Sequence, residues 1–115
     1  MLYSFAQKIY DKKGMNITAI DVRGVSSLTN YLLIADGSVD RHVIALGNAV
    51  LEEAKDLGMQ VFHIDGEQEG DWVVVDLGEM MVHLFIPEMR EKYRLEQVWH
   101  QGKLVEIPLK TEEMK

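Results

Sequence analysis

The sequence contains no cysteine, and its 12 lysine and arginine residues are outnumbered by 19 aspartate and glutamate residues. The absence of cysteine excludes a disulfide framework, thiolate catalysis and a zinc–thiolate site. The shortage of basic residues leaves a formal net charge of -7. This charge argues against direct binding to bare DNA or RNA, because neutralising phosphates requires a surface rich in lysine and arginine. A basic protein is a suitable partner for such a chain.

Long hydrophobic runs are also missing. No apolar segment approaches the roughly 18 residues that a membrane-spanning helix needs, and residues 1–5 lack the charged start and cleavage site of a signal peptide. We therefore expect a cytoplasmic protein with no membrane partner. The composition, 47% hydrophobic and 27% charged, is that of a soluble globular chain. A chain of 115 residues suits one domain that buries about two thirds of its unfolded surface.

The hydrophobic pattern predicts an alternation of helices and strands. Helices are expected over residues 2–13, about 38–57 and 87–93, and strands over residues 17–22, 31–35, 59–64 and on both sides of a turn within 71–85. This order predicts an α/β (α+β) fold, in which a mixed sheet of about five strands is flanked by helices. We expect Ser38 or Asp40 to cap the long helix and Leu57-Gly58 to end it.

The domain is expected to cover residues 1–102. The remaining residues, 103–115, mix charge with Pro108, and they are predicted to form a flexible C-terminal tail.

The segment from Asp71 to Phe85 predicts a β-hairpin. Two β-rich runs flank the dipeptide Leu77-Gly78, and a dipeptide ending in glycine between such runs is a turn signal. A two-residue turn predicts the cross-strand pairs Asp76–Glu79, Val74–Met81 and Trp72–His83.

Side chains alternate between the two faces of a strand, so the faces of this hairpin can be separated. One face is wholly apolar and belongs in a core: Val73, Val75, Met80, Val82 and Leu84. The other face combines an aromatic ring, aliphatic groups and acids: Trp72, Val74, Asp76, Glu79, Met81 and His83. A large amphipathic ring beside unpaired carboxylates is typical of a docking surface. We predict that these six residues bind a partner protein, with His83 stacked on Trp72.

Catalytic patterns are incomplete. Gly37-Ser38, between a strand and a helix, resembles the phosphate-binding start of nucleotidyltransferase domains. Those enzymes also need two carboxylates separated by one residue, and the chain has no Asp-x-Asp pair; Asp36 would in addition repel a phosphate. Asp76 and Glu79 could share a proton as a catalytic pair. An exposed hairpin end implies no pocket, however, so a solvated turn or a contact patch is the simpler interpretation.

Metal-binding spacing is absent from the sequence. The four histidines, His42, His63, His83 and His100, do not occur at helical or zinc-ligand spacing. We therefore expect no catalytic residue, no metal and no cofactor.

Trp99 ends the pattern Arg90-x-x-Tyr93-x-Leu95-Glu96-x-x-Trp99, and we expect it to pack the last segment onto the sheet.

Taken together, these segments resemble the Iojap family of ribosomal silencing factors, RsfS, from about residue 2 to residue 99. The most specific portion is the hairpin, residues 72–85, followed by the pattern that ends at Trp99; residues 21–29 and 37–43 support it. Three positions depart from the family pattern: Asn30 stands where aspartate is usual, Val39 shifts a Gly-Thr-Ser pattern, and Glu79 replaces aspartate. Of these, only Glu79 touches the predicted docking surface, and it keeps the charge.

The resemblance implies a fold related to nucleotidyltransferases without their active site. It implies a protein that is not an enzyme, that binds the large ribosomal subunit through ribosomal protein fourteen, blocks association with the small subunit and represses translation under nutrient limitation. Two alternatives stay open. One is a nucleotide-binding or nucleotidyltransferase-like enzyme with its site near Gly37-Ser38. The other is a homodimer that uses the mixed hairpin face on itself when free.

Overall fold

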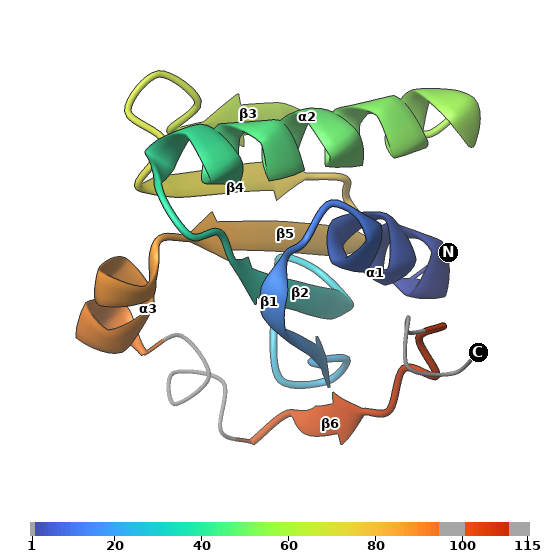
Figure 1. The fold of residues 1–115 in the computed structure, drawn as a ribbon. Coiled ribbons are helices and arrows are strands. Elements are labelled where there is room, and N and C mark those ends of the chain that lie inside the picture. The colour runs from blue at the N-terminus through green and yellow to red at the C-terminus, as the bar shows by residue number, and fades with distance from the viewer. Residues whose placement is uncertain (1, 95–100, 111–115) are drawn as a thin grey trace.

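The fold is a six-stranded mixed sheet with helices on both sides (Figure 1). It is seen in a computed structural model, which describes residues 2–94 and 101–110. The elements are α1 Leu2–Asp11, β1 Met15–Asp21, β2 Tyr31–Asp36, α2 Asp40–Asp56, β3 His63–Asp65, β4 Trp72–Asp76, β5 Met80–Phe85, α3 Pro87–Tyr93 and β6 Lys103–Val105. The predicted α+β class, with helices flanking a mixed sheet, is confirmed.

The strand order is β3-β4-β5-β2-β1-β6, in which only β2 and β5 pair in parallel among the described strands. The apolar run Leu32–Ala35 of β2 is buried throughout, as the sequence predicted for a central strand. The strand predicted over residues 59–64 is shorter and later, and it forms the edge strand β3. In the described part of the chain, no helix combines the length and apolar character that crossing a bilayer requires.

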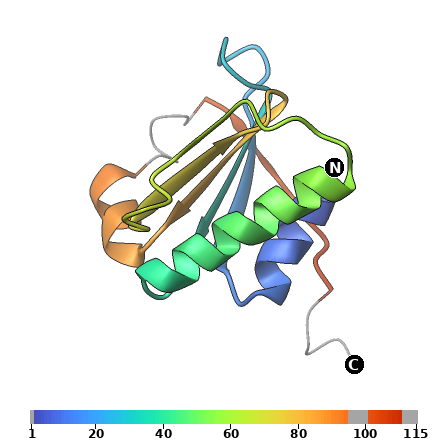
Figure 2. The ribbon, with the colours of Figure 1, turned by 90° about the horizontal axis from the view of Figure 1, so that it is seen from above.

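Helices α1 and α2 cover one face of the sheet, as Figure 2 shows from above. The apolar stripe of α2 packs into this layer with the predicted apolar hairpin residues, and the members of both groups are buried: Val43, Leu46, Val50, Ala54, Val73, Val75, Met80, Val82 and Leu84. Gly47 allows close approach here, because a Cβ atom would lie 3.3 Å from Cγ1 of Val73. The separation of the hairpin into a core face and a second face is confirmed.

The hairpin turn lies one residue later than predicted. Asp76 pairs with Met81 and the amide of Leu77 donates to the carbonyl of Met80 at 2.9 Å, so Gly78-Glu79 forms the turn and the predicted pairs are wrong by two positions. A two-residue type I′ turn needs positive φ at both central residues, which suits Gly78 (φ +82°) but not Leu77. Leu77 is instead buried in the core. A shift of two keeps every side chain on its predicted face.

The C-terminal segment is part of the domain as far as residue 110. β6 pairs antiparallel with β1, and the partly buried side chains of Val105, Ile107 and Leu109 pack against the core. Gln7 of α1 donates to the carbonyl of Lys110 at 3.1 Å and accepts from its amide at 2.9 Å. The domain end at residue 102 and the flexible tail were therefore wrong for residues 103–110, because alternating apolar residues cover the edge of β1. Residues 111–115 lie outside the described part.

Candidate functional site

The sheet face opposite α1 and α2 holds the predicted docking residues, and we call it the open face. A small apolar cluster, in which no residue is more than 3% exposed, forms its centre: Ile20, Val22, Leu32, Ile34 and Phe85. Around this cluster Trp72, Val74, Asp76 and Met81 are half-buried, and His83 is 8% exposed. Glu79 is exposed in the turn next to them. The structure thus brings the six predicted residues to one face and its adjoining turn, and a partner for them remains a prediction.

Trp72 is the centre of an aromatic cluster on the open face. Its ring lies 5.0 Å from the ring of Phe85 and 4.8 Å from that of Tyr93 in α3, in both cases tilted. Tilted rings at such centroid distances contribute about 1 kcal/mol per pair beyond their area burial. Trp72 therefore packs against both β5 and α3, and it is half-buried.

His83 contacts Trp72 through a hydrogen bond and not through stacking. The indole Nε1 of Trp72 donates to Nδ1 of His83 at 3.2 Å, and the rings are tilted by 43°. The predicted stacking was wrong, because the displaced turn places Val74, not Trp72, directly opposite His83. His83 stacks instead on Phe85, with an interplanar angle of 12°. Burial lowers the pKa of His83 to about 4, so the imidazole is neutral and its Nδ1 can accept the indole proton.

Asp76 and Glu79 each accept one hydrogen bond at the turn. Oδ1 of Asp76 accepts from the amide of Gly78 at 2.9 Å, and Oε2 of Glu79 accepts from Nδ2 of Asn30 at 2.9 Å. Neither carboxylate takes part in an ion pair between described residues. Their negative charges are therefore not neutralised by a described side chain, as the sequence predicted. Asn30, which sequence reasoning placed away from this surface, touches it through Glu79.

The loop of Gly37 and Ser38 has its own internal hydrogen bonds. The amide of Gly37 donates to the carbonyl of Phe85 at 2.8 Å, and the amide of Ser38 donates to Nδ1 of His42 at 2.8 Å. A phosphate at the start of a helix needs free amides, and these two are already engaged. The hollow beside the loop is about 350 Å³ in volume, and four of its lining residues are acidic: Asp40, Glu69, Asp71 and Glu88. The local charge therefore opposes a nucleotide.

The predicted helix cap was wrong. The N-cap of α2 is Val39, in extended conformation, and no side chain caps the helix. The carboxylate of Asp40 accepts from the amide of Arg41 at 2.7 Å, while Ser38 contacts His42. The imidazole of His42 also bonds the carbonyl of Lys12 at 2.8 Å, so it ties the loop to the end of α1. A loss of cap stability on replacing Ser38 with alanine therefore has no structural basis.

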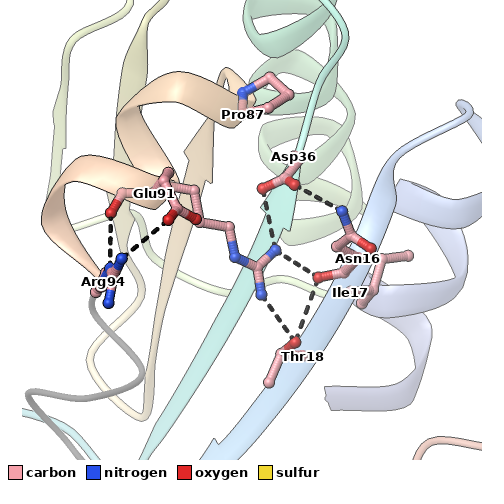
Figure 3. A pocket seen from close by; sticks show the side chains of 8 residues that line it. Asn16, Ile17, Thr18, Asp36, Pro87, Glu91 and Arg94 are labelled. Carbon is pink, nitrogen blue, oxygen red and sulfur yellow. Dashed lines mark hydrogen bonds and ion pairs between the residues drawn. The ribbon is translucent and has the colours of Figure 1, made fainter.

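A buried ion pair between α3 and the sheet was not foreseen from the sequence. Arg90 of α3 and Asp36 at the end of β2 lie 3.0 Å apart, with side chains 12% and 4% exposed. They line an open recess of about 720 Å³ that Figure 3 shows from close by. The available signal was an aspartate directly after a buried strand, because such a carboxylate needs a cation or several donors.

Comparison with known proteins gives the family of this chain. Residues 1–115 match the family RsfS, described as "Ribosomal silencing factor during starvation". The chain belongs to this family. The ribosomal silencing factor RsfS of Bacillus subtilis is 36% identical over 97 residues, which cover 84% of this chain and 82% of that protein. The RsfS of Haemophilus influenzae is 40% identical over 87 residues, covering 76% of this chain and 85% of that protein.

A solved structure has the same fold. The crystal structure of a protein from Chromobacterium violaceum superposes with a TM-score of 0.82 at 29% sequence identity, covering 97% of this chain and 93% of the other. In the sequence pattern that ends at Trp99, the first two residues lie in α3: Arg90 contacts Asp36, and Tyr93 contacts Trp72. The other members of that pattern, Leu95, Glu96 and Trp99, lie outside the described residues, so the predicted packing of Trp99 is untested.

The described side chains form no group of three or more histidines or acids that could hold a metal ion. Among the histidines, His42 and His83 each have hydrogen-bond partners within the protein, and His63 lies exposed in β3. His100 lies outside the residues that the structure places. The chemistry available on the open face is thus apolar contact and negative charge.

We predict that His83 makes folding sensitive to acid. In the unfolded chain its pKa is near 6.5, whereas in the folded protein it is about 4. Between these values only the unfolded state takes up the proton, so stability is full above pH 6.5 and falls by up to about 3 kcal/mol as the pH decreases to 4. Replacing His83 with glutamine should reduce the difference between urea unfolding free energies at pH 7 and pH 4.5. The same change at exposed His63 is the control, and equal acid sensitivity in both variants would contradict the assignment.

Proposed function

We propose that this protein binds the large ribosomal subunit through ribosomal protein fourteen and blocks association of the two subunits, thereby repressing translation when nutrients are limiting. The observation that supports the proposal is the open face, which joins a half-exposed tryptophan to two acids without described ion-pair partners. The names of its relatives, ribosomal silencing factors, agree with this function. The proposal assigns no reaction to the protein. The extent to which it blocks subunit association in the cytoplasm is set by its concentration and by its affinity for the large subunit.

The two parts of the open face have different effects on binding. Asp76 and Glu79 attract a basic ribosomal protein, and such charges chiefly raise the association rate and set the orientation. Trp72, Val74 and Met81 offer apolar area that a partner can bury, and buried aromatic residues supply most of the binding energy at protein interfaces. The buried His83 accepts a hydrogen bond from the indole of Trp72 and so helps to hold the ring in place.

The proposal is tested by co-sedimentation with isolated ribosomal subunits and by an assay of subunit joining. We expect the protein to pellet with large subunits and not with small ones, and to slow the joining of the two. Replacing Asp76 and Glu79 with lysine should slow association and abolish the fall of its rate with salt, because attraction becomes repulsion.

The matched control is the replacement of Glu52 and Asp56 with lysine. Replacing these two acids changes the net charge by the same amount, but they lie on α2 and not on the open face. The control variant should bind as the unaltered protein does. Equal effects of the two double variants would show that net charge alone matters, and the assignment of the acids would then be wrong.

A nucleotide-binding enzyme remains the alternative to test. It predicts heat of binding when ATP, GTP or CTP is titrated with magnesium in a calorimeter, whereas our proposal predicts none. The engaged amides of Gly37 and Ser38 favour the second result.

We further propose that the free protein can form a homodimer through the open face. In that case large subunits should compete with dimerisation, which light scattering and sedimentation can measure.

A further inference from the structure

Helix α3 has few apolar contacts to hold it on the sheet. None of its residues is fully buried, and its seven residues form only two turns. Met89 packs at the margin of the apolar cluster of the open face, and Tyr93 is 43% exposed while its ring lies against Trp72. A helix this short depends on tertiary contacts for its position.

Arg90 supplies a set of polar contacts that joins α3 to two strands at once. One terminal nitrogen donates to Oδ1 of Asp36 in β2 at 3.0 Å and to the carbonyl of Asn16 in β1, and the other donates to the hydroxyl of Thr18 at 2.9 Å. Nδ2 of Asn16 in turn donates to Oδ2 of Asp36 at 2.9 Å (Figure 3). The planar fork of the guanidinium fits acceptors in several directions, which an ammonium group on a flexible stem does less well.

The backbone at Asn16 is shaped for this contact. Asn16 has a φ of +51°, a left-handed conformation that costs energy for a residue with a side chain, and the β1–β2 register is irregular between Met15 and Thr18. This bulge turns the carbonyl of Asn16 toward Arg90. The hydrogen bonds to Arg90 and Asp36 offset part of that conformational cost.

We propose that Arg90 is a positioning residue for docking: its contacts with Asp36, Asn16 and Thr18 fix α3, so that Tyr93 holds the ring of Trp72 in one orientation on the open face. The inference rests on the proposed function, because it concerns how the same site is kept ready to bind. Tyr93 follows Arg90 by three residues, so the two side chains lie on neighbouring positions of the helix surface. Arg90 bonds to β1 and β2, and Tyr93 contacts Trp72 in β4.

A fixed Trp72 lowers the entropy that binding must remove. Ordering one large side chain on association costs up to about 1.5 kcal/mol, which corresponds to about tenfold in affinity. Releasing α3 should therefore weaken docking even though Arg90 lies in the recess at the end of β2, among residues other than the docking set.

The experiment compares Arg90→Met with Arg94→Met. Both arginines line the recess, but the described side-chain contacts of Arg94 are with Glu91 of α3, and its side chain is 56% exposed. Two quantities are measured: the affinity for isolated large ribosomal subunits, and the nuclear Overhauser contacts between the rings of Trp72 and Tyr93. Arg90→Lys is included because it keeps a cation near Asp36 if the methionine variant fails to fold.

We expect Arg90→Met to lose the ring contacts and about tenfold in affinity, while amide exchange in β2 and β5 shows an intact core. Arg90→Lys should show smaller changes in both quantities, and Arg94→Met none. Unchanged ring contacts in Arg90→Met, whatever the affinity, would overturn the positioning role, as would lost ring contacts with unchanged affinity. Failure of the unaltered protein to bind large subunits would refute the proposed function instead, and the ring contacts would still report whether Arg90 positions Trp72.

Discussion

Replacing Trp72 with alanine is expected to weaken binding to the large ribosomal subunit by about 2 kcal/mol, roughly thirtyfold in Kd. The indole is half-buried, and on the open face its ring lies beside those of His83, Phe85 and Tyr93. A partner that covers this face would bury the remaining surface of the ring, and a truncated side chain cannot replace that contact. Pelleting with large subunits at increasing protein concentration measures the change.

Two further variants separate docking from folding. Trp72 also packs against Phe85 and Tyr93, so alanine at this position should lower thermal stability as well. Trp72→Phe keeps a ring in the cluster and should lose less affinity. Tyr3→Ala removes an aromatic residue, 37% exposed, from α1 on the opposite side of the sheet, and it should not change binding. Normal pelleting of the Trp72→Ala protein would rule out Trp72 as a docking residue.

Replacing Leu84 with alanine is expected to lower the free energy of unfolding by about 3 kcal/mol, through lost apolar contact and the cavity that remains. Leu84 is fully buried in the layer between the sheet and the two long helices. Urea unfolding at constant pH measures this loss. Binding per folded molecule should persist, because the side chain points away from the open face.

The matched control is Val74→Ala on the neighbouring strand. Val74 is half-buried on the open face, so its truncation should cost less than about 1 kcal/mol of stability. A similar loss of stability in both variants would mean that both faces of the hairpin carry the core. An unchanged unfolding free energy in Leu84→Ala would mean that the core face is assigned incorrectly.

Periodic patterns made most of the fold predictable. The alternation from Trp72 to Phe85 separated the two hairpin faces, and the continuous apolar run of β2 predicted a central strand. The helical spacing from Val43 to Ala54 gave the buried stripe of α2. Each of these signals depends on a few neighbouring residues, so it survives small errors of register or boundary.

The wrong predictions depended on contacts between distant segments. The cap of α2 was assigned to the nearest polar residues, whereas Ser38 binds His42, whose imidazole is held by the carbonyl of Lys12, 30 positions earlier. β6 is too short to show a pattern of its own, and it is a strand because it pairs with β1. The position of the turn was decided by Leu77, which gains more from burial in the core than it would from exposure at the tip of the turn.

The features of the candidate site also divide into those that local sequence determines and those that tertiary contacts determine. The sequence by itself determined which residues share the open face, because alternation along a strand is a local property of the backbone. Only the tertiary structure decided that Asp36 is neutralised by Arg90, 54 positions later in the chain, while no described cation neutralises Asp76 or Glu79. The physical reason is that the free energy of a carboxylate depends on its burial and on the nearest cation. Both are set by which strands and helices pack together.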